Sequence, residues 1–408
     1  MKKLAVIGCG LRSDCYLSEM QAFLGKEWVL AALADPNPVA IEVYQKNFGS
    51  PSVEVFADGP SLLEAMKGKI DGVIIGSPNV EHLASLLPAL EQGLTILLEK
   101  PVATTLEDCV KMWHGYREAG EPPLAVGFVL RYTPFYKKIK EFIASGKLGQ
   151  VLSIQATELL GPALSANYMR GWRRFTRASG PLILEKCSHD FDILNWLTDS
   201  RAVRVSSFGS RTRFVPNPEA SMHCKDCALE NECRYAAGRI APYLMNWGRA
   251  KALGPLIAVD NDLCVFNSEK DIWDHQVANI EYANGILASF TVCMDAPKTT
   301  RTILVNGTQA QLFGDISEDS LEIRHHVDGR SEKASVEMVP IKHDGSAHHG
   351  GDSVISTHFR SMLANGEIKP LAGLREGIEA AMLALAAERA ARTSTVVEGE
   401  QIFGGLSF

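Results

Sequence analysis

The sequence predicts an α/β domain built on a doubly wound parallel sheet, followed by an α+β domain with a large, mainly antiparallel open sheet. Up to about residue 125, short continuous apolar runs alternate with helical patterns, which is typical of parallel strands covered on both faces. After about residue 130, several segments alternate apolar and polar residues, which is typical of strands with one exposed face. We therefore expect residues 1–125 to form the first domain and residues 126–408 the second.

The first domain is expected to alternate strands with helices. Its strands are continuous apolar runs, and several end at turn signals such as Gly8 and Asp35-Pro36. They are Leu4–Ile7, Trp28–Leu33, Val53–Phe56, Gly72–Ile75, Thr95–Leu98 and Leu124–Val129. Helical patterns lie between them at Ile41–Phe48, Ser61–Met66 and Glu81–Glu91. This order favours a parallel sheet with helices on both faces.

The second domain is expected to contain strands whose side chains alternate between a buried and an exposed face. These are Val151–Thr157, parts of Ala202–Phe214, Gln276–Tyr282, Ile286–Cys293, Thr302–Val305 and Glu322–His325. Leu374–Arg392 is dense in Ala, Leu and Glu and gives the strongest helical pattern of the chain. The irregular segment 215–265 holds a cluster of cysteines and is interpreted as an excursion from the sheet.

Composition excludes several classes of protein. Lys and Arg number 41 against 48 Asp and Glu, a net charge of −7, which argues against a nucleic-acid or anionic-membrane surface. No apolar run approaches the 18 or so residues of a membrane span, and the run Leu4–Ile7 is too short for a signal peptide. We therefore expect a soluble, cytoplasmic protein. In that reducing compartment the nine cysteines should not form structural disulfides.

A glycine-rich turn between the first strand and the first helix predicts a nucleotide site. Gly8 allows a tight turn, Gly10 allows close approach of a pyrophosphate, and Ser13 stands where Gly or Ala is usual. Asp35, at the end of the second strand, is placed to accept hydrogen bonds from ribose hydroxyls and to repel a 2′-phosphate, so NAD is favoured over NADP. A glycine turn without a nucleotide, and Asp35 as a helix cap before Pro36, remain open alternatives.

Two segments carry candidate catalytic groups. Lys100 directly follows an apolar strand, and the carboxyl ends of parallel strands are where such sheets bind ligands. If Pro181 opens a helix, Glu185, His189 and Asp192 lie on one face of it, where carboxylates can orient the imidazole for proton transfer. A solvated lysine and a surface ion-pair cluster are the simpler alternatives.

Taken together, these motifs resemble the glucose–fructose oxidoreductase / inositol dehydrogenase / MocA family. The matching segments are VIGCGLRS at the start, LLEKP ending at Pro101, GFVLRYTPFY at 127–136, SGKLGQV at 145–151, GWRRF at 171–175, ILEKCSHDFDILNWL at 183–197, DHQVANIEYANG at 274–285 and HGGD at 349–352. The resemblance implies an N-terminal Rossmann domain and a C-terminal domain whose open sheet packs subunit on subunit, as a homodimer or homotetramer.

The resemblance also implies roles for individual residues. Lys100 matches a lysine that hydrogen-bonds the substrate hydroxyl, and His189 a histidine that removes its proton, while Glu185 stands where many members carry Asp. The substrate side is expected to include Arg131, Tyr132, Trp172, Arg173 and Asp192, although Arg131 and Arg173 fit equally well as ion-pair formers. The cofactor side is expected to include Gly8, Gly10, Leu11, Arg12, Ser13, Asp35, Ser77, Pro78, Asn79, His82, Glu99 and Lys100. One histidine of the pair His348-His349 is a further candidate for a substrate contact, with a surface turn as the alternative.

The predicted function is an NAD-dependent oxidoreductase that takes hydride from a secondary alcohol of a sugar, inositol or related polyol. One alternative is a glycosidase that oxidises its substrate transiently, eliminates the substituent and reduces the product. The other is a non-catalytic, NAD-dependent regulator. A base beside the nicotinamide, as His189 would be, argues for the enzyme.

Four cysteines in and after the irregular segment have the spacing of metal ligands. Cys224-x2-Cys227-x5-Cys233 is followed by Cys264, and four thiolates at a closed tetrahedral site suit a structural Zn²⁺. His223 competes with Cys264 for the fourth position. Iron–sulfur ligation and free thiols remain open.

Overall fold

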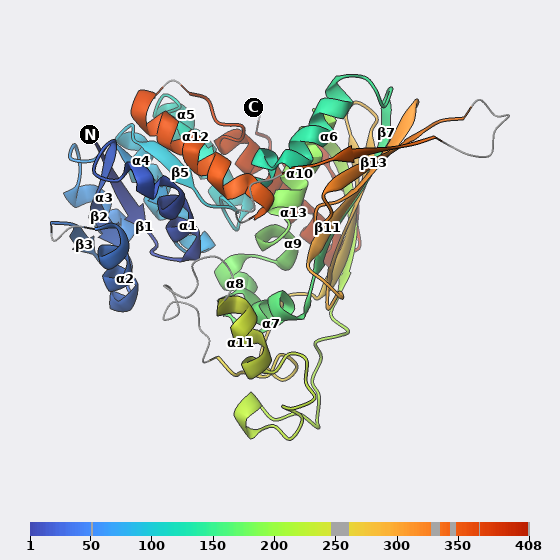
Figure 1. Cartoon of the computed structure of the whole chain (residues 1–408), viewed down its shortest axis with the longest axis horizontal. Helices are drawn as coiled ribbons and strands as arrows, with labels where there is room; N and C mark the ends of the chain where they lie inside the picture. Colours follow the sequence, from blue (N-terminus) through green and yellow to red (C-terminus); the bar gives the residue numbers. More distant parts are fainter. Residues whose placement is uncertain (50–51, 246–260, 328–334, 343–347, 367, 407–408) are drawn as a thin grey trace.

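The computed structural model describes residues 1–49, 52–245, 261–327, 335–342, 348–366 and 368–406, without the side chains of 242–245. Its two sheets lie at opposite ends of the molecule with helices between them (Figure 1). The predicted fold class, a doubly wound parallel sheet followed by a larger, mainly antiparallel one, is confirmed. None of the described helices is long and apolar enough to span a bilayer.

Sheet A is parallel throughout and has the strand order β3-β2-β1-β4-β5-β6. Its strands are β1 (Lys2–Ile7), β2 (Trp28–Ala34), β3 (Glu54–Phe56), β4 (Gly72–Ile75), β5 (Thr95–Leu98) and β6 (Leu124–Val126). The helices that follow these strands are α1 (Leu11–Met20), α2 (Pro38–Phe48), α3 (Gly59–Ala65), α4 (His82–Glu91) and α5 (Leu106–Glu118). The strand order reverses between β1 and β4, and ligands bind such sheets outside the carboxyl ends of the strands at this point.

Sheet B has nine strands in the order β14-β13-β12-β11-β7-β10-β9-β8-β15. Neighbours are antiparallel except for the central pair β7 and β10. The strands are β7 (Val151–Leu160), β8 (Ala202–Ser210), β9 (His275–Tyr282), β10 (Leu287–Met294), β11 (Thr300–Gly307), β12 (Ala310–Asp315), β13 (Ser320–His325), β14 (Val336–Pro340) and β15 (Val397–Glu398). The sequence patterns do not predict β12, β14 or β15.

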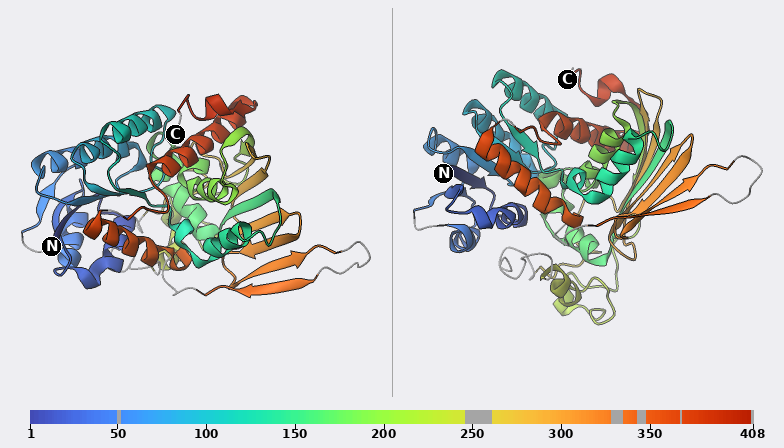
Figure 2. Two further views of the ribbon diagram at one scale, coloured as in Figure 1. Left: turned by 90° about the horizontal axis from the view of Figure 1, so that it is seen from above. Right: turned by 45° about the horizontal axis from the view of Figure 1, so that its top comes forward.

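Helices cover the face of sheet B that is turned toward sheet A (Figure 2). They include α6 (Pro134–Ala144), α10 (Ser188–Thr198) and the long α13 (Leu374–Thr393), the helix expected at Leu374–Arg392. Helix α12 (Gly351–Asn365) packs on α1, and α13 packs on α5, so the C-terminal part of the chain returns to cover sheet A. The remaining α-helices are α7 (Pro162–Arg170), α8 (Thr176–Ser179), α9 (Leu182–Glu185), α11 (Ala237–Met245) and α14 (Gly399–Ile402).

Two sequence expectations are wrong in detail. The strand expected at Leu124–Val129 ends at Val126, because the Phe128 amide donates back to the Val126 carbonyl and the chain turns into the 3-10 helix η3 (Val129–Tyr132). The single helix expected after Pro181 is two helices, α9 and α10, separated at Lys186-Cys187. Cys187 has φ −99° and ψ 4°, outside the α region, so Glu185 and His189 do not share one helical face.

Candidate active site

The turn after β1 has a backbone that suits only glycine at position 8. Gly8 has φ +86°, a conformation that residues with a side chain rarely adopt. A Cβ added there would lie 2.4 Å from the Ser77 nitrogen, in the loop after β4. The loops after β1 and β4 therefore touch at the point where the strand order of sheet A reverses.

The N-terminus of α1 is uncapped, because its N-cap residue, Gly10, has no side chain that could accept a hydrogen bond from the first turn. A Cβ added at Gly10 would meet nothing within 4 Å, and Leu11 beside it is exposed. Ser13 is buried; its Oγ donates to the Gly8 carbonyl oxygen (2.8 Å) and lies against Gly76. An uncapped helix N-terminus beside free space fits the pyrophosphate of a dinucleotide, and Ser13 preserves the close helix–strand contact that Gly or Ala usually provides.

Asp35 stands at the end of β2 and faces the glycine turn. Its Oδ2 accepts a hydrogen bond from the Cys9 amide (2.8 Å), and its Oδ1 accepts one from the Asn37 amide (2.8 Å). The helix cap of α2 is Asn37, whose side chain accepts from Val39, so the helix-cap alternative for Asp35 is wrong. Each carboxylate oxygen keeps a second lone pair for a ribose hydroxyl.

The cofactor residues predicted after β4 connect neighbouring loops of sheet A. His82 is fully buried; its Nε2 lies 3.0 Å from the Ser77 carbonyl oxygen and its Nδ1 lies 3.0 Å from that of Pro101. The Asn79 side chain donates to the Ser179 carbonyl oxygen (2.9 Å) in α8. Pro78 is exposed beside them. These contacts join the loop after β4 to the loop after β5 and to α8.

Arg12 ties the nucleotide turn to the C-terminal helix α12, a link that sequence analysis does not predict. Its guanidinium donates to Glu99 Oε1 (3.0 Å), to the Tyr16 hydroxyl (2.8 Å) and to Asp352 Oδ1 (2.9 Å). Asp352 is fully buried, and its other oxygen lies 2.7 Å from His348 Nδ1. Burial favours the neutral acid, but Arg12 and His348 outweigh it and hold the pKa of Asp352 well below its usual range.

Lys100 and Glu185 meet at the carboxyl edge of sheet A. Lys100 Nζ donates to the Glu185 carbonyl oxygen (2.7 Å). The Glu185 carboxylate instead accepts from Arg173 Nε (2.7 Å) and from the Tyr168 hydroxyl. Burial alone would raise the pKa of Glu185, but Lys100 and Arg173 lower it to about 2. Burial lowers the pKa of Lys100, against the opposing charge of Glu185 and Glu99.

His189 is buried near Lys100 at the start of α10. Its ring centroid lies 5.8 Å from that of Phe128 and 6.4 Å from that of His348. Among the described residues its Nδ1 has no hydrogen-bond partner. Burial, with the positive charge of Lys100 as the second cause, holds the pKa of His189 well below its ordinary value. The imidazole is therefore neutral at neutral pH and can accept a proton.

The expectation that neighbouring carboxylates orient His189 is wrong. Asp192 accepts two hydrogen bonds from Arg131 (2.9 and 2.7 Å), and both side chains are buried. Arg131 also donates to the Leu371 carbonyl oxygen (2.6 Å), so the ion-pair alternative describes it. Asp190 pairs with Arg301 (2.8 Å). Although His189, Asp190 and Asp192 all belong to α10, both carboxylates pair with arginines and not with the imidazole.

The other predicted substrate residues form two groups, Tyr132 beside α12 and Trp172 with Arg173 beside Glu185. The Tyr132 hydroxyl accepts from the Leu371 amide (3.1 Å) and lies 3.2 Å from His358 Nδ1, on the side of α12. Trp172 is exposed, and the Arg173 guanidinium lies 4.6 Å from the centroid of its ring. Arg173 reaches from this surface to Glu185 and belongs to the Lys100 cluster. Tyr168 also belongs to that cluster and is not predictable from the sequence, because no motif links it to Glu185.

A dinucleotide turn and a neutral, buried base at one edge of a doubly wound sheet define a class, the dinucleotide-dependent oxidoreductases. Two family models then place the chain within it. "Oxidoreductase family, NAD-binding Rossmann fold" matches residues 2–128, and "Oxidoreductase family, C-terminal alpha/beta domain" matches residues 140–398. The chain belongs to this family, GFO/IDH/MocA, as its motifs indicate, and is an oxidoreductase with an NAD-binding domain.

The individual relatives of this chain have low sequence identity to it. YteT of Bacillus subtilis (strain 168), named as an oxidoreductase, is 26% identical over 380 residues, which cover 86% of this chain and 87% of YteT. The inositol 2-dehydrogenase of Corynebacterium glutamicum (strain R) is 28% identical over 43% of this chain and 48% of its own. A levoglucosan dehydrogenase solved with NADH and L-sorbose shares the fold, with a TM-score of 0.74 at 20% identity over 98% of this chain and 100% of that one.

Proposed function

We propose that this oxidoreductase transfers hydride from a secondary alcohol of a sugar, inositol or related polyol to NAD. The observation that carries the proposal is that Lys100, held by the Glu185 carbonyl oxygen, lies close enough to the buried His189 for its charge to lower the pKa of that histidine. Relatives named inositol 2-dehydrogenase and a structural neighbour named levoglucosan dehydrogenase support the substrate class.

The two side chains divide the work on the substrate hydroxyl. Lys100 uses one N–H on the Glu185 carbonyl oxygen and keeps two for the substrate oxygen. His189 takes the hydroxyl proton as the C–O bond gains carbonyl character. NAD, when bound, supplies the acceptor for the hydride that leaves the same carbon. Glu185 is a positioning residue, because its carboxylate meets Tyr168 and Arg173 while its carbonyl oxygen holds Lys100.

The lowered pKa values predict the pH dependence of kcat/KM. His189 must be neutral, and its pKa lies well below the ordinary value of about 6.5, so kcat/KM should stay constant from pH 7.5 down to 6.5 and fall only at lower pH. Lys100 must be protonated, and its pKa is lowered, so activity should fall on the basic side before the ordinary lysine value of about 10.4. Initial rates in a constant-ionic-strength buffer series measure both limbs. If kcat/KM already falls above pH 7 as the pH is lowered, the role given to His189 is contradicted.

We also propose that Asp35 selects NAD over NADP. In Asp35→Asn one amide oxygen can still accept from the Cys9 amide, while the charge that repels a 2′-phosphate is lost. The ratio of kcat/KM for NAD to that for NADP should fall about tenfold or more, since a carboxylate close to a phosphate costs over 1 kcal/mol at an effective dielectric constant of about 20. An unchanged ratio in a variant of unchanged Tm excludes Asp35 as the selector.

A substrate screen tests the proposed function. The protein is incubated with NAD and a panel of inositols, free sugars and glycosides, and both NADH and organic products are measured. Formation of NADH with one ketone product per turnover is the expected result. Cleavage of a glycoside without net NADH shows the transient-oxidation reaction instead, and saturable binding of NADH without turnover of any panel member shows a regulator. Either result overturns the proposed net dehydrogenation.

Two further proposals concern how copies of the chain assemble and where its two domains meet. We propose a homodimer or homotetramer that pairs the face of sheet B left uncovered by helices. Apolar side chains exposed on that face include Phe208, Val277, Leu287 and Phe313, and Phe208 pairs with Val277 across strands β8 and β9. We place the domain boundary at residues 125/126, within the last strand of sheet A, which ends at Val126.

A further inference from the structure

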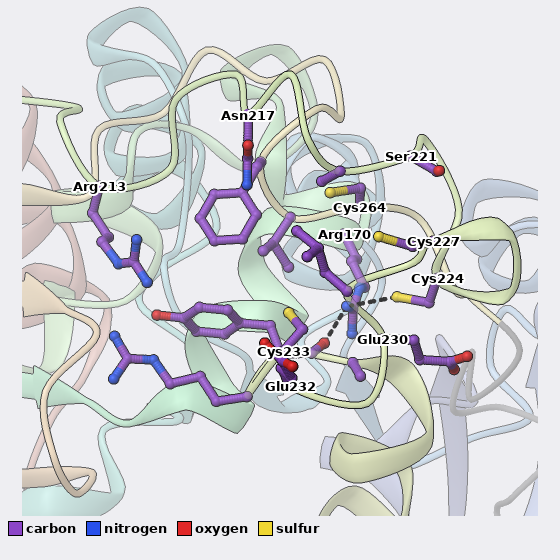
Figure 3. A pocket seen from close by; sticks show the side chains of 17 residues that line it. Arg170, Arg213, Asn217, Ser221, Cys224, Cys227, Glu230, Glu232, Cys233 and Cys264 are labelled. Carbon is purple, nitrogen blue, oxygen red and sulfur yellow. Dashed lines mark hydrogen bonds between the residues drawn. The ribbon is translucent and has the colours of Figure 1, made fainter.

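Four cysteines outside the active site line a single cavity of about 390 Å³ (Figure 3). Three of them, Cys224, Cys227 and Cys233, come from one stretch of the irregular segment, and Cys264 comes from its return to sheet B. All four are free thiols, and Cys224 and Cys264 are buried. The fold therefore brings together the four residues that their sequence spacing singles out.

Backbone hydrogen bonds set this arrangement. Cys224 begins the 3-10 turn η5 (Cys224–Asp226), and the Cys227 amide donates to the Cys224 carbonyl oxygen (3.0 Å), as a chelating Cys-x-x-Cys pair requires. An antiparallel bridge between His223 and Leu263 brings the second segment alongside. The Cys224 amide donates to the Asp262 carbonyl oxygen (2.8 Å), and the Cys264 amide donates to the Met222 carbonyl oxygen (2.8 Å).

A cation and a backbone donor lie beside the thiols. The Arg170 guanidinium donates to Cys224 Sγ (3.5 Å), and the Ala237 backbone amide also donates to this sulfur. Arg170 joins both segments through the carbonyl oxygens of Leu263 (2.6 Å) and Tyr235. The charge of Arg170 also interacts with Cys233 and Cys264, and with the Asp262 carboxylate. A buried arginine beside four thiols would offset the net charge of a metal bound to four thiolates.

We propose that Cys224, Cys227, Cys233 and Cys264 bind one structural Zn²⁺ ion. Each thiol releases its proton to solvent and gives a sulfur lone pair to the metal, with no change of oxidation state. Four thiolates at a closed site favour Zn²⁺ among divalent metals that keep tetrahedral geometry. His223 is left out of the proposed ligand set because its side chain does not line the cavity.

The described side chains are not in coordination geometry: no three His, Cys, Asp or Glu among them form a metal-binding group as they stand. Binding must therefore be accompanied by movement of thiols that share one cavity. The site lies at the end of α7, the helix that supplies Tyr168 to Glu185. A metal here would hold the excursion against α7 through Arg170.

Metal analysis of the full chain tests the proposal. The protein is purified without chelator, and its metal content is measured by inductively coupled plasma mass spectrometry. We expect about one zinc per chain, released on titration of the thiols of the wild-type protein with an organomercurial. Cys227→Ser with Cys233→Ser should lose the zinc, whereas the control Cys293→Ser, which lies outside the cavity, should keep it.

The wild-type titration keeps the test valid if the double variant does not fold. Substoichiometric zinc after purification and after incubation with added Zn²⁺ overturns the proposal. Stoichiometric iron with labile sulfide overturns the choice of zinc, and zinc lost equally from Cys293→Ser overturns the assigned ligands. None of these measurements depends on the enzyme's substrate, so they stand apart from the proposed dehydrogenase activity.

Discussion

Replacing Lys100 by Met is expected to lower kcat about 10³-fold while NADH binds as before. Lys100 is the charged donor that reaches the carboxyl edge of sheet A beside His189, and methionine fills a similar volume without an N–H or a charge. Loss of a preorganised donor to a reacting oxygen costs about 10²–10³ in kcat, and the lost charge adds to it.

The measurement is kcat with the best substrate of the screen, with NADH affinity from fluorescence titration of the same sample. Lys111→Met is the matched control, because Lys111 is an exposed lysine on α5 that pairs with exposed Glu107. It should leave both quantities within about twofold, as expected of a surface change. Turnover by Lys100→Met at the wild-type rate contradicts the assigned role, and loss of NADH affinity would make Lys100 a cofactor residue instead.

Replacing Gly8 by Ala is expected to remove NADH binding together with much of the stability of the first domain. The φ of +86° is strained for alanine, and the new Cβ would lie 2.4 Å from one backbone atom of the β4 loop and 2.5 Å from two others. Strained backbone costs about 1–3 kcal/mol, and a backbone clash adds to this, so the free energy of unfolding should fall by about 3 kcal/mol or more.

Gly10→Ala is the informative partner of this variant. Gly10 has φ −96°, and its added Cβ would meet no protein atom within 4 Å, so Tm should not change. The methyl group would instead occupy the space beside the open end of α1, and NADH affinity should fall at least tenfold. Thermal unfolding and NADH titration of both variants separate the two effects. Unchanged NADH affinity in a folded Gly10→Ala protein would move the pyrophosphate site away from this turn.

The sequence patterns predict most of the fold because the buried strands of sheet A read as continuous apolar runs. They miss β14, whose side chains are almost all exposed, so that no buried face imposes an alternating pattern. They also miss the break between α9 and α10. Lys186, at that break, forms an ion pair with the buried Glu158 of β7 (3.3 Å), a contact that local periodicity cannot reveal.

In the active site, too, local sequence patterns predict some features, whereas others depend on tertiary contacts. Gly8 and Asp35 are predictable because a turn and a strand end fix their positions relative to the helix dipole and the sheet edge. The partners of the charged groups are not, since each arises from tertiary packing. Arg12 with Asp352 joins residues 340 positions apart, and Arg131 with Asp192 removes from His189 the carboxylate that sequence proximity suggests.

Transfer of deuterium tests the central claim most directly. The substrate turned over fastest in the screen is prepared with deuterium on the carbon that becomes the ketone. It is then incubated with NAD and the protein. Hydride transfer predicts that every NADH formed carries that deuterium, together with a primary isotope effect on the single-turnover rate. Unlabelled NADH, or a product formed with no label passing to the nicotinamide, would contradict hydride transfer from a secondary alcohol in the site of Lys100 and His189.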